Sequence, residues 1–269
     1  MNQDKYITEV NRVADDVWTE FQRNLGITYN RPTITFSQNE YEERIRRNAG
    51  VYGFPDPLFS THGEDYVIRE DTFGHGLTST AFYRGNLIIG PIKIANVPES
   101  ILKVYLEHEF SHFIAYRSDP HYGVTMDILK DHSAKTQPKA FKMLVDDFCD
   151  LFNESLAWIP PYQFSGREAV LEKAKHDARN AKRLTQFGID PEALLLSNKM
   201  ILGLAETLHY EKAIDAKILL KPMSIMTENH PLIEKGSVGV RKVLDGFMEI
   251  YKIAKRRGVK VYVDDIGKL

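Results

Sequence analysis

The most constraining feature of this sequence is a helical stretch that carries His-Glu-x-x-His near its centre. No glycine or proline interrupts Ile101 to Tyr116, and Asn96-Val97-Pro98-Glu99 ahead of it has residue types that begin helices, with Asn96 as the expected cap. On a helix, side chains four residues apart lie one above the other, so His108 and His112 can converge on one metal ion. The stretch therefore predicts a helix with both imidazoles on one face.

Glu109 lies one step round this helix and points near the same ion. Zinc lowers the pKa of its bound water towards neutrality, so a carboxylate beside it can accept the water's proton. The motif thus predicts a Zn²⁺ site with His108 and His112 as metal ligands and Glu109 as the catalytic general base. The alternative is a surface helix with two solvated histidines.

A second expected helix, residues 141–158, carries acids at Asp146, Asp150 and Glu154, each four residues apart. Asp150 is the predicted third metal ligand because it has an acid one turn away on either side, and such neighbours orient a ligand. Asp146, Asp147 and Glu154 are then alternative ligands or groups that orient one, with Glu154 the first reserve. A row of acids beside an apolar stripe is also typical of a solvated helix face.

The break between the two helices contains His121 and Tyr122, within Ser118 to Gly123. His121 follows soon after His112 and is an alternative third ligand. Tyr122 is a candidate contact to the transition state. Ordinary turn residues would fit these positions equally well.

The strand expected at Asn86–Ile94, the His-Glu-x-x-His helix and the acidic helix together resemble the zincin metallopeptidases. The resemblance is to their compact, thermolysin-like gluzincin form, in an uncharacterised archaeal and bacterial branch, and it covers residues 80–158. It implies an α+β fold with a small mixed sheet, and a zinc-dependent hydrolase that cleaves peptide bonds with a Glu-activated, zinc-bound water. The Asn-Glu-x-x-Ser-Asp pattern of thermolysin is absent, which leaves the third ligand open.

The length of 269 residues allows one large domain or two. Trp158-Ile159-Pro160-Pro161 ends the acidic helix and is the expected boundary. It divides a zincin-like metallopeptidase domain, residues 1–160, from a mostly helical C-terminal region, residues 161–269. That region is either separate or packed on the first domain as one unit.

Composition narrows the expected surroundings and partners. The net charge of −2 argues against a general electrostatic grip on nucleic acid, so the expected partner is a peptide or protein substrate. The single cysteine, Cys149, suits a reducing compartment. The first residues have no apolar core of a signal peptide, and no apolar run is long enough to span a bilayer. We therefore expect a cytoplasmic protein of undetermined oligomeric state.

Two other classes compete with a zinc peptidase. Glu109-x-x-His112 and Glu206-x-x-His209 form two Glu-x-x-His pairs, which a carboxylate-bridged di-iron helical protein requires. One zinc per chain, against two irons, separates this class from the peptidase. A catalytically silent zincin-fold interaction protein with a structural zinc is the other alternative, and a peptidase assay with and without Glu109 identifies it.

Overall fold

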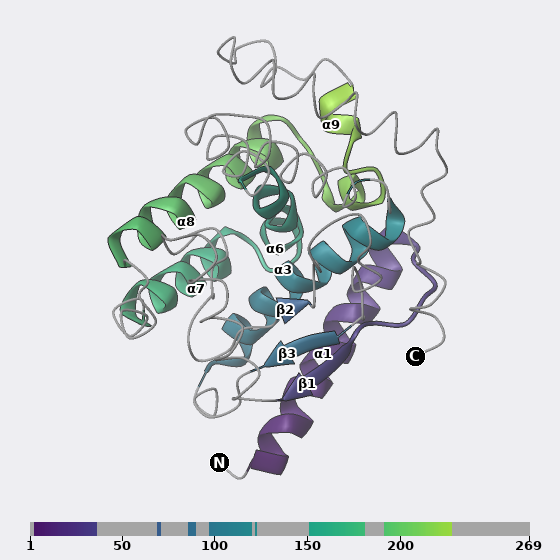
Figure 1. The fold of residues 1–269 in the computed structure, drawn as a ribbon, viewed down its shortest axis with the longest axis vertical. Helices are drawn as coiled ribbons and strands as arrows, with labels where there is room; N and C mark the ends of the chain where they lie inside the picture. The colour runs from purple at the N-terminus through teal and green to yellow at the C-terminus, as the bar shows by residue number, and fades with distance from the viewer. Residues whose placement is uncertain are drawn as a thin grey trace, which may run out of the picture.

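The computed structural model describes residues 3–36, 69–70, 86–89, 97–119, 122, 151–180 and 191–227 (Figure 1). Helices make up about 80% of the described chain. They are α1 (Gln3–Leu25), α3 (Glu99–Ser118), α6 (Ile159–Phe164), α7 (Arg167–Asn180), α8 (Pro191–Glu206) and α9 (Ser224–Thr227). A π-helical segment, η4 (Thr207–Glu211), and a 3-10 helix, η5 (Ala216–Leu220), lie between α8 and α9, and residues 151–157 are also helical.

Three short strands complete the described elements: β1 (Thr33–Phe36), β2 (Arg69–Glu70) and β3 (Asn86–Ile89). β3 lies between the other two, parallel to β1 and antiparallel to β2, with Thr33 opposite Asn86. The expected α+β class is wrong for the described chain, which is predominantly helical. Strands of two to four residues bury little apolar surface, so the core forms between helices instead.

α1 is an amphipathic helix. The spacing of its apolar residues predicts a helix over Asp4–Asn24, and the observed helix is one residue longer at each end. Val10, Val13, Val17 and Phe21 recur at helical spacing and are buried. Gly26 ends the helix with a φ of 71°, and its N–H donates to the carbonyl of Gln22 at 2.9 Å. A residue without a side chain suits this left-handed position.

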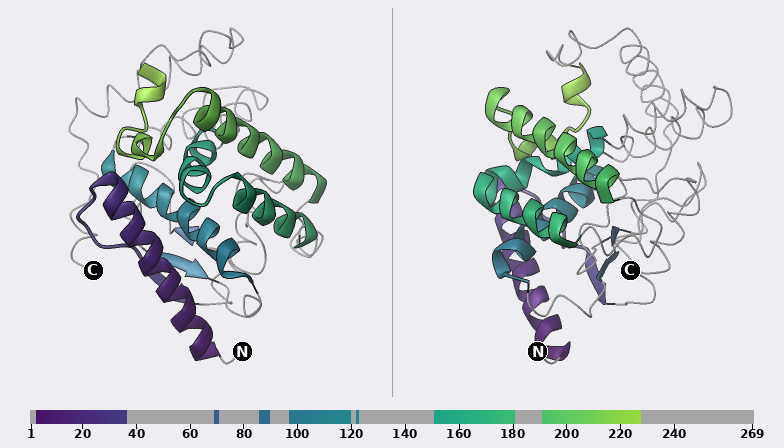
Figure 2. Two further views of the ribbon diagram at one scale, coloured as in Figure 1. Left: turned by 180° about the vertical axis from the view of Figure 1, so that it is seen from behind. Right: turned by 90° about the vertical axis from the view of Figure 1, so that its left-hand side faces the viewer.

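α3 is the central helix of the described chain, with α1 along one side and α6 and α7 on the other (Figure 2). Its residues from Ile101 to Tyr116 are all buried except the half-buried Lys103. The helix begins at Glu99 with Pro98 in the cap position and no side-chain cap, so the expected Asn96 cap is wrong. A helix buried on every side is held by its packing and depends little on a cap.

Aromatic rings make up much of the contact between α1 and α3. The indole of Trp18 meets the ring of Phe110 edge-on at 5.3 Å between centroids, and the ring of Phe113 at 5.7 Å. The indole N–H donates to the carbonyl of Tyr29 at 3.1 Å. These contacts fix the face of α3 that turns towards α1, and therefore also the opposite face.

The helices after residue 158 pack on the other side of α3. Val104 of α3 shares a buried cluster with side chains of α6, α7 and α8, namely Tyr162, Val170, Ile201 and Ala205 together with Trp158. The expected domain boundary after residue 160 falls inside α6, whose Ile159 and Tyr162 are buried. The described parts of the two expected regions therefore share one core.

Asp190-Pro191 predicts the start of a single helix that runs to about Leu219, but the structure differs. α8 ends at Glu206, η4 follows, and Ala213 adopts a φ of 53° before η5 begins. A left-handed alanine interrupts a helix, which accounts for the break. The sequence also predicts a short helix at residues 40–48, an amphipathic helix at 237–257 and a strand at 259–263, all of which lie outside the described residues. Among the described helices, none combines the length and apolar character needed to cross a membrane.

Candidate metal centre

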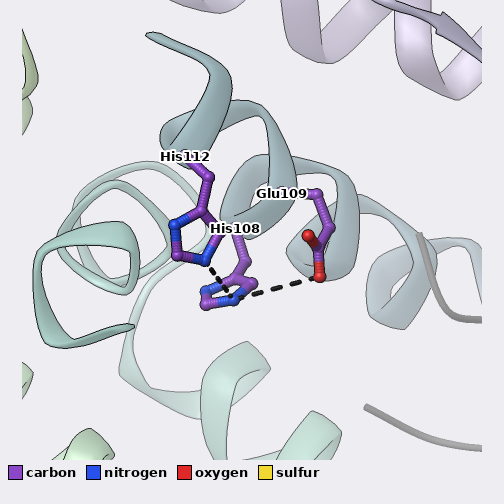
Figure 3. Close-up of side chains that lie close together, drawn as sticks. All are labelled: His108, Glu109 and His112. Carbon is purple, nitrogen blue, oxygen red and sulfur yellow. Dashed lines mark hydrogen bonds and ion pairs between the residues drawn. The ribbon is translucent and has the colours of Figure 1, made fainter. Parts of the chain in front are cut away.

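His108, Glu109 and His112 lie together on one part of α3 (Figure 3). The Nε2 atoms of the two histidines are 3.2 Å apart, and Oε1 of Glu109 is 4.0 Å from Nε2 of His108. All three side chains are buried, with exposed fractions of 1%, 7% and 8% along the chain. The one-turn spacing in the sequence therefore brings the Nε2 atoms of the two histidines close together, as predicted.

Glu154, in the helical residues 151–157, reaches both histidines with its carboxylate. Its Oε2 is 3.2 Å from Nε2 of His108, and its Oε1 is 3.4 Å from Nε2 of His112. The carboxylate comes from the acidic segment that was expected to supply a third ligand. Two imidazole nitrogens and one carboxylate thus face a common centre, between α3 and the segment that follows it in the described chain.

These donors lie close enough to share one zinc ion. The two Nε2 atoms are 3.2 Å apart, and each lies within 3.4 Å of a different carboxylate oxygen of Glu154. The oxygen of Glu109 lies further out, 4.0 Å from Nε2 of His108. Two histidines and one glutamate are also a ligand set that catalytic zinc sites use, with the fourth position left for water or substrate.

Burial and nearby carboxylates act in opposite directions on the two imidazoles. Burial lowers the pKa of His108 to about 4 although Glu154 opposes the shift, so this ring is neutral near pH 7. Burial alone would lower the pKa of His112 too, but the charges of Glu154 and Glu109 and hydrogen bonds to Glu154 and Asn153 raise it. A neutral imidazole is the form that can bind a metal, and His108 is in that form near pH 7.

Neighbouring side chains hold the two histidine rings. The indole of Trp158 packs against the imidazole of His108 at 4.4 Å between centroids, with 33° between the planes. Asn153 hydrogen bonds the ring of His112 and accepts a hydrogen bond from the hydroxyl of Tyr122 at 3.1 Å. Tyr122 is fully buried, and its hydrogen bond to Asn153 connects it to His112. Its role as a transition-state contact stays a prediction.

Glu107 is a buried carboxyl group on the other side of the metal helix. It accepts a hydrogen bond from Ser165 Oγ at 2.8 Å, and its Oε1 is 3.5 Å from Nζ of Lys103. Lys103 also pairs with Glu20 of α1 at 2.9 Å. Burial raises the pKa of Glu107 to about 8. These contacts connect α3 to α1 and to the residue that follows α6.

Sequence reasoning did not assign roles to Asn153 and Trp158, and it ranked Glu154 only as a reserve ligand. The sequence did contain a signal for Asn153 and Glu154. Asn153-Glu154 matches the first two positions of the thermolysin pattern Asn-Glu-x-x-Ser-Asp, although Ala157-Trp158 stands where the pattern ends in Ser-Asp. No comparable signal pointed to the ring contact of Trp158 with His108.

The structure does not describe four of the other expected site residues. Asp146, Asp147, Asp150 and His121 lie outside the described residues, so the ligand role of Asp150 stays a prediction. The second Glu-x-x-His pair has other partners: Glu206 accepts from Nε of Arg167 at 2.6 Å, and Nδ1 of His209 lies 2.9 Å from the carbonyl of Ile214.

Comparison of the chain with models of protein families, with curated proteins and with solved structures found no match. A function for the chain has therefore to follow from the residues of the metal centre.

Proposed function

We propose that this chain is a zinc-dependent peptidase in which His108, His112 and Glu154 hold the metal and Glu109 is the general base. The observation that carries the proposal is the spacing of the three donors, 3.2, 3.2 and 3.4 Å, in a buried site. Two imidazole nitrogens and a carboxylate are donors of the types that catalytic zinc sites use, and here they converge from α3 and the helical residues 151–157.

The position of Glu109 suits a base better than a ligand. When bound, zinc supplies a Lewis acid that lowers the pKa of a water and polarises a carbonyl oxygen. Glu109 stands beside the proposed ligands, with its Oε1 4.0 Å from Nε2 of His108, where its carboxylate would accept the proton of a zinc-bound water. The same carboxyl group then returns the proton to the nitrogen of the leaving amine.

The peptide bond as substrate is supported by the resemblance to zincin metallopeptidases. In that resemblance the third ligand comes from the acidic segment after the metal helix, and Glu154 occupies such a place. A peptide or protein is accordingly the proposed substrate. Buried surroundings favour the chemistry, because they keep bulk water away and strengthen the charge interactions of the site.

The di-iron alternative lacks a second set of ligands in the described chain. Glu206 pairs with Arg167, and His209 contacts the carbonyl of Ile214, while the described residues grouped closely enough to hold a metal ion are His108, Glu109 and His112, with Glu154 in contact with both histidines. One zinc and one base therefore account for the site better than two irons.

The decisive experiment combines metal analysis with a peptidase assay on the parent chain and the Glu109→Gln variant. We expect one zinc per chain in both proteins, and cleavage of a broad panel of peptides and unfolded proteins, followed by mass spectrometry, only in the parent. Glutamine keeps the shape of the side chain but accepts no proton, so the rate should fall by orders of magnitude. Zinc loss in the variant would make Glu109 a ligand, and equal activity would exclude it as the base.

Glu107→Gln is the matched control for this test. It makes the same substitution at the preceding position, on a carboxyl group that contacts Ser165 and Lys103 and not the histidines. Because burial raises the pKa of Glu107 to about 8, its carboxyl group is largely protonated near pH 7 and an amide replaces it closely. We expect parental zinc content and activity. Parental zinc without cleavage of any substrate by the parent would instead indicate a catalytically silent interaction protein.

A further inference from the structure

Lys173 of α7 is a buried lysine enclosed by aromatic rings. Its exposed fraction is 1%, and its Nζ lies 4.4 Å from the ring centre of Tyr105 and 4.4 Å from that of Trp158. An ammonium group loses much hydration free energy on burial, and the faces of aromatic rings return part of it. The position therefore holds a positive charge inside the core, next to α3.

The two rings around Lys173 belong to residues that lie beside the metal centre. Tyr105 precedes His108 by three residues on α3, and the indole of Trp158 packs against the imidazole of His108 at 4.4 Å. The ammonium is thus no more than two ring contacts from a metal ligand.

We propose that Lys173 is a positioning residue of the metal centre, which acts through Trp158 and through its charge to weaken the binding of the metal cation and strengthen it as a Lewis acid. The inference rests on the proposed zinc site and adds to it a residue that tunes the site from outside the ligand set. A carboxylate near a metal-bound histidine makes the ligand more basic and the metal more tightly held. A cation behind the Trp158 ring acts in the opposite direction.

A role in packing alone explains Lys173 less well. A methionine of similar length would fill the same space between Tyr105 and Trp158 without the cost of burying an ammonium group. The two rings are placed to stabilise a cation and not merely an alkyl chain, because both lie at cation–π distance from Nζ. The charge itself is therefore the property to test.

The test compares the zinc dissociation constants of the full-length parent, Lys173→Met and Lys173→Arg, measured by competition with a chromophoric chelator. Removing a unit positive charge near a dication should tighten zinc binding by about ten- to a hundredfold in the methionine variant. Arginine keeps the charge and stacks on aromatic rings, so it should restore the parental constant. Visible spectra of the Co²⁺ forms report whether the ligand geometry is unchanged.

Lys175→Met is the matched control, because it removes one positive charge from the same helix at a position that is exposed to water. Lys175 is 66% exposed and pairs with Glu172 at 2.6 Å. Its replacement should leave the zinc constant unchanged. Equal tightening in this control would reveal a general effect of net charge and overturn the role of Lys173.

The remaining outcomes are equally decisive. Unchanged or weaker zinc binding in Lys173→Met, or tighter binding in Lys173→Arg, overturns the proposal. Thermal unfolding of the metal-free proteins checks that each variant folds, and Lys173→Gln, also neutral, replaces the methionine variant if that one does not. A parent that binds no zinc refutes the metal centre itself, whereas a parent that binds zinc with variants that match it refutes only the role of Lys173.

Discussion

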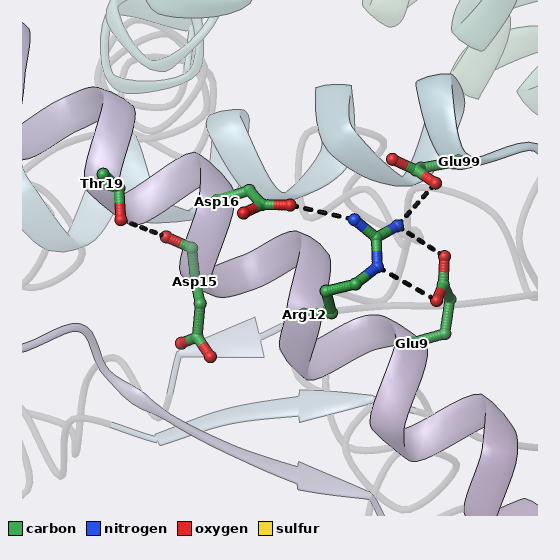
Figure 4. Close-up of polar contacts among 6 residues, drawn as sticks. All are labelled: Glu9, Arg12, Asp15, Asp16, Thr19 and Glu99. Atoms are coloured by element: carbon green, nitrogen blue, oxygen red, sulfur yellow. Dashed lines mark hydrogen bonds and ion pairs between the residues drawn. The ribbon is translucent and has the colours of Figure 1, made fainter.

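The metal centre on α3 and a cluster around Arg12 on α1 hold their polar groups at similar distances but in opposite surroundings. The guanidinium of Arg12 lies 2.7 Å from Glu9, 3.0 Å from Asp16 and 2.6 Å from Glu99 of α3 (Figure 4). These side chains are 42–68% exposed. Water competes for every one of these contacts, and dissolved salt screens them.

At the metal centre, similar distances between polar groups have a different effect on the pKa of those groups. Its donors are 3.2–3.4 Å apart, and burial moves the pKa of His108 to about 4. At the arginine cluster, hydrogen bonds lower the pKa of Glu9 and raise that of Arg12, so both groups only keep the charges they carry in water. Proximity of charged groups is therefore not by itself a functional signal. Burial of several donors around one point is the signal, because such groups need a compensating partner.

The largest expected effect comes from removing both histidines of the metal centre. The double variant His108→Ala with His112→Ala loses two of the three proposed ligands, so stoichiometric zinc should disappear from the purified protein in elemental analysis. His176→Ala, on α7 and outside the cluster, is the control and should keep its zinc. If the double variant kept its zinc, the buried histidines would not be the metal site, and their proposed functional difference from the arginine cluster would be lost.

A smaller effect separates the candidates for the third ligand. Glu154→Ala should weaken zinc binding by more than the roughly 10–100-fold expected when a group that only orients a ligand is lost. Its carboxylate is within 3.2 and 3.4 Å of the two histidines, which is the reason for ranking it first. Asp150→Ala and His121→Ala, measured in the same titration, should fall within or below that range. The reverse ranking would return the ligand role to Asp150 or His121.

The smallest effect is expected at the arginine cluster. Arg12→Ala removes three ion pairs, but the side chain is 46% exposed and each partner remains in water. The midpoint of thermal unfolding should therefore shift little, and zinc content should not change. A melting curve in low and in high salt measures both the shift and its screening. A large, salt-independent loss of stability would show that these surface contacts do more than their exposure implies.

The elements that were predicted well are those whose pattern is local. The periodic valines of α1 and the uninterrupted run of α3 predict both helices, since a 3.6-residue repeat is read directly along the chain. The overall class was wrong because short apolar runs such as β1 and β3 do not reveal how much sheet they join. That amount depends on partners elsewhere in the chain.

At the metal centre, too, local spacing predicted some residues and tertiary packing decided others. His108, Glu109 and His112 follow from spacing alone, because one helical turn brings positions four apart together whatever the helix packs against. The acids at 146, 150 and 154 are four residues apart and are expected on one face of a helix, so their spacing cannot rank them. Only the packing of residues 151–157 against α3 brings the carboxylate of Glu154 to both imidazoles.

The sequence by itself thus predicted the helix that brings His108, Glu109 and His112 together, since these residues lie within five consecutive positions of one regular helix. The tertiary structure decided which carboxylate meets them, that the ring of Trp158 supports His108, and that Lys173 is buried behind it. The contacts of Glu154, Trp158 and Lys173 with α3 join residues more than forty positions apart in the chain. They depend on how helices pack on one another, which no local repeat encodes.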